Sequence, residues 1–99
     1  MKTAWKFAEI ERNFFHRMST CGWNVSSIVD VGGSDGAWSR TLAEVFPHAR
    51  FDLFEPLAEH NSEYASALRD LQLQLPSLHV HPVALGNHAG TQDFWRQQY

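Results

Sequence analysis

The feature that most constrains this chain is a short apolar run that ends in an aspartate and passes directly into a glycine-rich loop. It covers residues 27–39 and reads Ser-Ile-Val-Asp-Val-Gly-Gly-Ser-Asp-Gly-Ala-Trp-Ser. This order is typical of a buried strand that feeds a ligand-binding loop at the carboxyl edge of a parallel sheet. Asp30 is the unusual residue, because a carboxylate at the end of a buried strand costs desolvation unless it caps the loop or meets a ligand.

Predicted helices and strands alternate along the chain. Apolar residues at three- and four-residue steps, with Pro and Gly as terminators, predict three helices. Short apolar runs between turn residues predict the strands. The helices are expected at residues 4–20, from Trp38 to Pro47 and from Leu57 to Pro76, and the strands at 23–31, 50–55, 78–85 and 91–95. This alternation predicts an α/β, Rossmann-like fold with a mainly parallel sheet and flanking helices.

Ninety-nine residues allow one domain. We expect residues 1–99 to form a single, partial domain that stops after three to four strands, because nothing remains to build the sheet beyond its first strand. Residues 1–22 form an N-terminal helix that packs on this domain. We expect its aromatic stripe, formed by Trp5, Phe7, Phe14 and Phe15, to face the sheet, with a partner- or substrate-facing role as the alternative. The first strand is expected to be covered on both faces. Trp38 is expected in the core, with a place beside a bound ligand as the alternative.

The charge balance and the single cysteine exclude several classes of protein. Eight basic and 11 acidic residues give a net charge of −3, without the basic stripe that nucleic-acid binding requires. No apolar run has membrane-spanning length, and Met1–Lys6 lacks the apolar block of a signal peptide. Cys21 has no partner for an intrachain disulfide, so we expect a cytoplasmic protein. His79 and His81 have no third ligand nearby, so we expect no metal site.

An acidic residue at the end of the second predicted strand indicates which kind of ligand the glycine loop binds. Glu55 follows Gly36 by 19 positions (55 − 36). A carboxylate there can accept hydrogen bonds from both hydroxyls of a ribose. Starting from Gly32, however, the dinucleotide fingerprint would need glycine where Ser34 stands, and Asp30 places negative charge where phosphates would lie. The residues therefore favour a ribose-bearing ligand with cationic groups and no pyrophosphate.

The loop resembles the first motif of the class I S-adenosylmethionine-dependent methyltransferases, Asp/Glu-x-Gly-x-Gly-x-Gly, and departs from it at Ser34. Two further motifs narrow the resemblance to one type within this class. They are the strand end Phe54-Glu55-Pro56 and the turn Val83-Ala84-Leu85-Gly86, with Gly90 and Phe94. Together these motifs are similar to those of the FkbM-type methyltransferases. The resemblance covers about residues 28–95, which is the amino-terminal half of such a domain.

This resemblance implies an enzyme that methylates a hydroxyl oxygen on a sugar or another small metabolite, with S-adenosylmethionine as cofactor. Asp30, Gly32 and Gly36 would line the methionine part of the cofactor, together with Gly33 and Ser34 of the same loop. Glu55 would hold the ribose, with Pro56 shaping the turn. Ala84 and Leu85 would lie near the adenine. The resemblance identifies no catalytic residue, and the residues that choose the acceptor would lie mostly in the other half of the domain.

Two alternatives remain at this stage. The first is a dinucleotide-dependent oxidoreductase, against which Ser34 and Asp30 argue. The second is a non-catalytic, truncated module that keeps the fold and acts in binding or dimerisation. The open edge of its first strand would then pair with a second chain to form a homo-oligomer.

Overall fold

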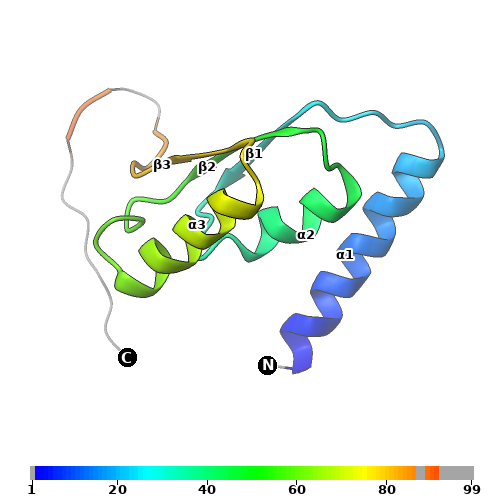
Figure 1. The fold of residues 1–99 in the computed structure, drawn as a ribbon, viewed down its shortest axis with the longest axis horizontal. Coiled ribbons are helices and arrows are strands. Elements are labelled where there is room, and N and C mark those ends of the chain that lie inside the picture. The colour runs from blue at the N-terminus through cyan, green and yellow to red at the C-terminus, as the bar shows by residue number, and fades with distance from the viewer. Residues whose placement is uncertain (1, 87–88, 92–99) are drawn as a thin grey trace.

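The computed structural model of the chain describes residues 2–86 and 89–91 (Figure 1). Helices and strands alternate in it, as the sequence predicts. The elements are α1 (Lys2–Thr20), β1 (Ser27–Val31), α2 (Ala37–Val45), β2 (Arg50–Phe54), α3 (Ser62–Gln74) and β3 (Leu78–His81).

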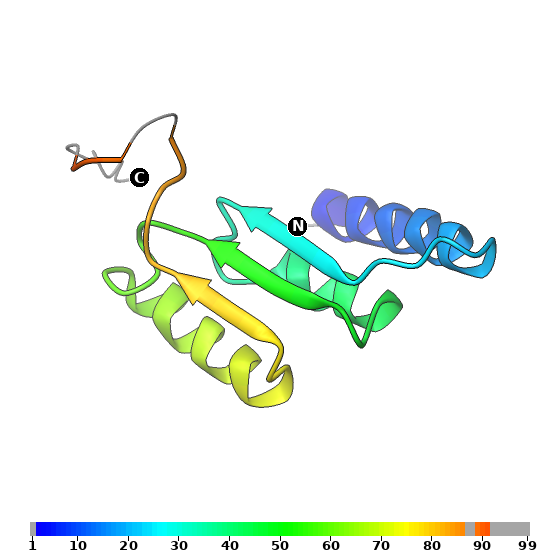
Figure 2. The same cartoon turned by 90° about the horizontal axis from the view of Figure 1, so that it is seen from above.

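The three strands form one parallel sheet in the order β1-β2-β3, and their arrows run side by side in the same direction in Figure 2. In the register of the sheet, Ile28 lies beside Phe51, and Phe51 lies beside Leu78. Each strand is joined to the next through a helix, which is the β-α-β unit that parallel pairing requires. The predicted α/β, Rossmann-like fold class is confirmed for the part of the chain that the structure describes.

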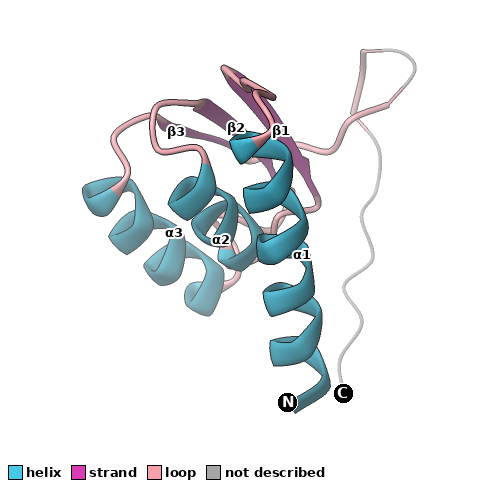
Figure 3. Ribbon diagram, turned by 90° about the vertical axis from the view of Figure 1, so that its right-hand side faces the viewer, coloured by secondary structure: helices cyan, strands magenta, loops and turns pink. Residues whose placement is uncertain are grey.

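The core lies between the sheet and the helices α2 and α3. Phe51 and Leu53 of β2 have no exposed surface, and Leu42 of α2 and Leu71 of α3 are each 2% exposed. Figure 3 shows all three helices on the same side of the strands. Right-handed crossovers that step across a sheet in one direction place their helices on one face.

The other face of the sheet is uncovered within residues 2–86 and 89–91, which corrects the expectation that β1 is covered on both sides. Burial alternates along β1, so that Ile28 and Asp30 are buried while Val29 and Val31 are 54% and 62% exposed. The apolar run Ile28–Val31 therefore has one face in the core and one face open. A continuous apolar run cannot by itself tell which of the two faces will be covered.

The helix α1 packs on α2 and not on the sheet, so the expectation that its aromatic stripe faces the sheet is wrong for Phe14 and Phe15; the side chains of Trp5 and Phe7 lie outside the described residues. Ile10, Phe14 and Met18 are 62%, 56% and 38% exposed. The ring of Phe15 instead lies 6.4 Å from that of Phe46, at the end of α2, and 6.0 Å from Trp23. Of the two stripe residues whose side chains are described, Phe15 therefore packs against the rest of the domain and Phe14 is mostly exposed.

Two strands are shorter than predicted. β1 begins at Ser27, not at Trp23, and β3 ends at His81 because Pro82 has no N–H group with which to continue the ladder. Ala84 and Leu85 therefore lie beyond the strand, in exposed irregular chain. Of the predicted fourth strand, Thr91 belongs to no strand, and residues 92–95 lie outside the described residues.

The packing of α1 predicts different costs for two adjacent phenylalanines. Replacing Phe15 with alanine should lower the free energy of unfolding by about 2 kcal/mol, because the ring packs against the core. The matched control Phe14→Ala, on the exposed side, should change it by less than about 0.5 kcal/mol. Urea denaturation measures both, and equal losses would contradict this packing of α1.

Candidate functional site

The loops that follow β1 and β2 meet at the carboxyl edge of the sheet. The backbone N–H groups of Gly32 and Gly33 both donate to the carbonyl oxygen of Phe54, at 2.8 and 3.3 Å. The glycine loop is thereby fixed beside the end of β2. Parallel strands bring successive loops to one edge, which is where open α/β sheets bind ligands.

Glu55 joins these two loops through its carboxylate. The residue is 7% exposed. Its Oε1 accepts a hydrogen bond from the N–H of Ser34 at 3.1 Å, and its Oε2 accepts one from the N–H of Leu57 at 3.0 Å. The structure therefore brings together the two features that the sequence singles out. An ionised carboxylate offers about four acceptor positions, so two remain for a ligand.

Asp30 is also buried, at 7% exposure, and its partner lies on α2. Its Oδ2 accepts a hydrogen bond from the hydroxyl of Ser39 at 2.8 Å, while no group in the described residues donates to Oδ1. Burial raises the pKa of Asp30, the Ser39 hydrogen bond opposes that rise, and the nearby Glu55 carboxylate adds to it. Asp30 thus has one satisfied oxygen and one that is available.

Ser39 is a residue of the site that sequence reasoning missed. It has no exposed surface and lies nine positions after Asp30, in the first turn of α2. A serine at the start of a helix usually suggests a cap, but this one holds a side chain of the preceding strand. The spacing between an acidic strand end and a hydroxyl in the next helix is the signal that could have revealed it.

The glycines of the loop have different reasons to be there. Gly32 has φ of +70°, in the left-handed region, and a Cβ there would meet no atom within 4 Å. A Cβ at Gly33 would clash with the side chain of Leu53, and one at Gly36 would lie 2.7 Å from Leu71 Cδ2. Gly33 and Gly36 therefore let the loop close onto the core, and Gly32 lets it turn.

Ser34 departs from the family's glycine yet keeps a glycine-like backbone. Its φ is +52°, which costs a residue with a Cβ about 1 kcal/mol. The hydrogen bond from its N–H to Glu55 stabilises this conformation. Beside it, Asp35 accepts a hydrogen bond from the N–H of Ala37 at 3.1 Å, at the start of α2.

A hollow of about 390 Å³ opens beside β1 and is lined by Trp38 and four consecutive residues, 29–32. Trp38 is 37% exposed, and its indole N–H donates to Glu11 Oε2 at 2.8 Å. The expectation that Trp38 lies in the core is therefore wrong. Its position at the second residue of α2 turns it toward α1, away from the sheet-facing side of the helix.

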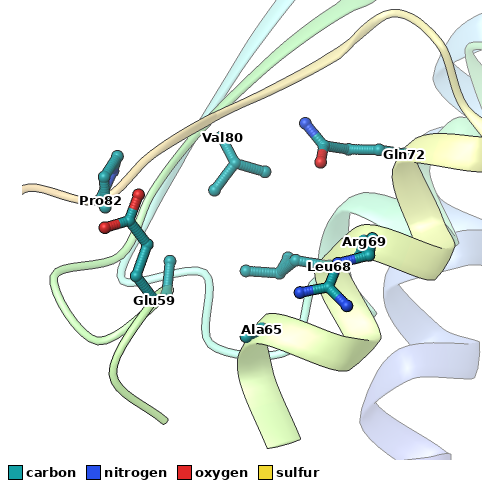
Figure 4. A pocket seen from close by; sticks show the side chains of 8 residues that line it. Glu59, Ala65, Leu68, Arg69, Gln72, Val80 and Pro82 are labelled. Carbon is teal, nitrogen blue, oxygen red and sulfur yellow. The ribbon is translucent and has the colours of Figure 1, made fainter. Parts of the chain in front are cut away.

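A second hollow, of about 320 Å³, lies between α3 and β3 (Figure 4). Leu68 and Val80 form part of its lining, with the charged side chains of Glu59 and Arg69 around it. None of the site residues predicted from the sequence lines this hollow. Pro56 lies in the turn between Glu55 and this region. Ala84 and Leu85 are exposed, and no hydrogen bond within the described residues links them to the loop or to Glu55.

The open face of the sheet carries a charged cluster that the sequence did not reveal. Asp52 accepts hydrogen bonds from Arg50 at 3.0 and 3.2 Å, and its Oδ1 lies 2.8 Å from His81 Nε2. The Arg50 guanidinium, and after it His81, hold the pKa of Asp52 well below its usual range. The ring of His81 stacks on Phe54, with centroids 4.5 Å apart. This cluster covers part of the face opposite the helices.

Within the part of the chain that the structure describes, no three His, Cys, Asp or Glu side chains gather as a metal site would require. Among the same residues, no helix combines the length and the apolar character needed to cross a membrane.

Comparison with known proteins finds similarity among solved structures. No family model matches the sequence, and no curated protein matches it. Among solved structures, the chain is similar to precorrin-6y C5,15-methyltransferase from Geobacter metallireducens GS-15, with 16% sequence identity and a TM-score of 0.47. The match covers 71% of this chain and 36% of that one, so the chain spans about a third of the neighbour's length. The fold class rests on the order and direction of the strands themselves.

The buried state of Asp30 predicts a pH-dependent effect of Asp30→Asn. Because the pKa of Asp30 is raised above its ordinary value of 3.8, the folded chain holds this proton more tightly than the unfolded chain. That contribution to stability is present below the ordinary pKa and is lost as the pH rises through the raised one. An asparagine has no such loss. The stability of Asp30→Asn relative to the native chain should therefore increase from about pH 3 to about pH 7.

Urea denaturation across this pH range measures the difference. A difference between Asp30→Asn and the native chain that stays constant with pH would contradict the assignment.

Proposed function

We propose that this chain is the cofactor-binding half of an FkbM-type, S-adenosylmethionine-dependent methyltransferase. Its reaction is transfer of a methyl group to a hydroxyl oxygen on a sugar or another small metabolite. The cytoplasm is the proposed location, and a small-molecule acceptor is the proposed partner.

One observation carries this proposal: the carboxylate of Glu55 lies against the glycine loop. Glu55 is buried at the carboxyl end of β2 and accepts the N–H of Ser34 from the loop that follows β1. Its remaining acceptor positions suit the two neighbouring hydroxyls of a ribose. A ribose at this point would lie directly beside Gly32, where the backbone is open.

The charge of the site supports S-adenosylmethionine over a dinucleotide. Asp30 and Glu55 place two carboxylates at one edge of the sheet, close enough for Glu55 to raise the pKa of Asp30. A pyrophosphate there would meet like charge, whereas the sulfonium and ammonium groups of S-adenosylmethionine would meet opposite charge. Ser34 also keeps a side chain where a pyrophosphate needs close approach of the backbone.

When bound, the cofactor supplies an electrophilic methyl carbon. The contribution of this chain is to bind and orient the cofactor. Glu55 would hold the ribose, Asp30 would face the cationic end, and the backbone of the glycine loop would lie against both. Positioning of two reactants accounts for a large share of such catalysis. The residues that choose the acceptor, and any general base, lie beyond those that build this site.

Replacing Glu55 with alanine should weaken S-adenosylmethionine binding by about 1–3 kcal/mol, because the ribose hydroxyls would lose their acceptor. Glu59→Ala, four residues on and exposed, is the matched control and should leave the affinity unchanged. Isothermal titration calorimetry measures the affinities, with circular dichroism to verify the fold of each variant. Unchanged affinity in a folded Glu55→Ala variant, or binding of NAD in preference to S-adenosylmethionine, would refute the proposal.

A second candidate function, a dimerising module without catalysis, rests on the edge of β1. In the described residues β1 pairs with β2 alone, so its outer edge is free. A free edge presents backbone donors and acceptors that a second chain can pair with. This function predicts a dimer in sedimentation velocity and no binding of S-adenosylmethionine. A monomer that binds the cofactor would exclude it.

A further inference from the structure

We propose that Trp38 is a ligand-binding residue whose indole ring forms the wall that receives the ammonium end of the bound cofactor, and that Glu11 of α1 holds this ring in place. This inference rests on the proposed function, because it names a further residue of the same cofactor site.

The position of Trp38 is the first argument. Its side chain lines the same hollow as Asp30 and Gly32, at the carboxyl end of β1. More than a third of the residue, 37%, is exposed, although the core begins four positions further along α2, at Leu42. The part of Trp38 that stays exposed is therefore available to a ligand in this hollow.

The second argument is that the ring is held. Its N–H donates to Glu11 Oε2 at 2.8 Å, across 27 positions of sequence. The helix that carries Glu11 is itself fixed to α2, by the ion pair of Arg12 with Glu44 at 3.1 Å and by the contact of Phe15 with Phe46. A ring fixed in this way loses little freedom when a ligand binds, which favours affinity.

The residues that line the hollow beside Trp38 favour a cationic ligand. The face of an indole ring carries negative electrostatic potential and attracts ammonium groups. Asp30 contributes a carboxylate whose Oδ1 accepts no hydrogen bond from the described residues. The other lining residues are Val29, Val31 and Gly32, and none is basic.

The geometry of the sheet indicates which cationic group reaches Trp38. Glu55, the proposed ribose ligand, follows β2, whereas α1, which holds Trp38, lies beyond β1 in Figure 2. Neighbouring strands are about 4.8 Å apart, so a ligand that runs from the end of β2 past β1 spans about 10 Å. The sulfonium is bonded to the ribose C5′ carbon and stays near the ribose. The ammonium lies at the far end of the aminoacyl chain and is the group that meets the ring.

The test compares two ligands that share adenosine and a thioether. S-Adenosylhomocysteine carries the aminoacyl end, and 5′-methylthioadenosine lacks it. In Trp38→Leu, affinity for S-adenosylhomocysteine should fall about five- to tenfold, while affinity for 5′-methylthioadenosine should stay within about twofold. Calorimetry on the full chain measures both, with circular dichroism to verify the fold.

Substitutions on α1 test whether Glu11 holds the Trp38 ring in place. Glu11→Ala should lower the affinity for S-adenosylhomocysteine selectively, and Glu11→Gln, which keeps an acceptor, should restore it. Glu9→Ala, which removes an exposed carboxylate two positions away on α1, is the matched control and should leave the ratio of the two affinities unchanged. If Trp38→Leu does not fold, Glu11→Ala decides the question.

Equal losses for the two ligands, or no loss for either, would overturn the role of Trp38 while leaving the proposed function intact. Failure of the native chain to bind either ligand or S-adenosylmethionine would overturn both.

Discussion

The carboxylate of Glu55 is the interaction on which the rest of the site depends. It accepts one backbone N–H from the loop after β1 and one from the turn after β2, so it fixes the distance between two loops that the sheet alone only brings to the same edge. Burying this charge would be costly without those bonds. The same bonds hold Ser34 in its left-handed conformation. A ligand that binds Glu55 therefore meets a site that is already assembled.

Asp30 is the second buried carboxylate of the site, and a described residue donates to only one of its oxygens. The Ser39 hydroxyl satisfies one of its oxygens, and burial beside Glu55 raises its pKa. Two carboxylates in one buried site repel each other, and a cationic ligand would relieve that repulsion. The two carboxylates together would therefore bind a cation more favourably than either carboxylate would alone. Under the proposed function, this coupling would make the positive charge of the ligand, and not the glycine loop by itself, the main source of selectivity.

The sequence predicted the features that depend on local chemistry. Alternating apolar runs, glycines and prolines gave the order of elements, the parallel sheet and the meeting of Glu55 with the loop. The failures concern contacts between distant elements. The sequence cannot tell which of Phe14 and Phe15, both members of the aromatic stripe, faces α2, and it cannot pair Trp38 with Glu11 across 27 positions. Nor does the apolar run in β1 show that Val29 and Val31 lie on an open face.

Under the proposed function, the one-sided arrangement of the helices would separate binding of the cofactor from the choice of acceptor. The carboxyl ends of β1 and β2, together with α2 and α1, supply every group that the proposal assigns to the cofactor. The opposite face carries Val29 and Val31, and the Arg50–Asp52–His81 cluster. We therefore expect binding of the cofactor to depend on α1, and the choice of acceptor to depend on whatever covers the open face.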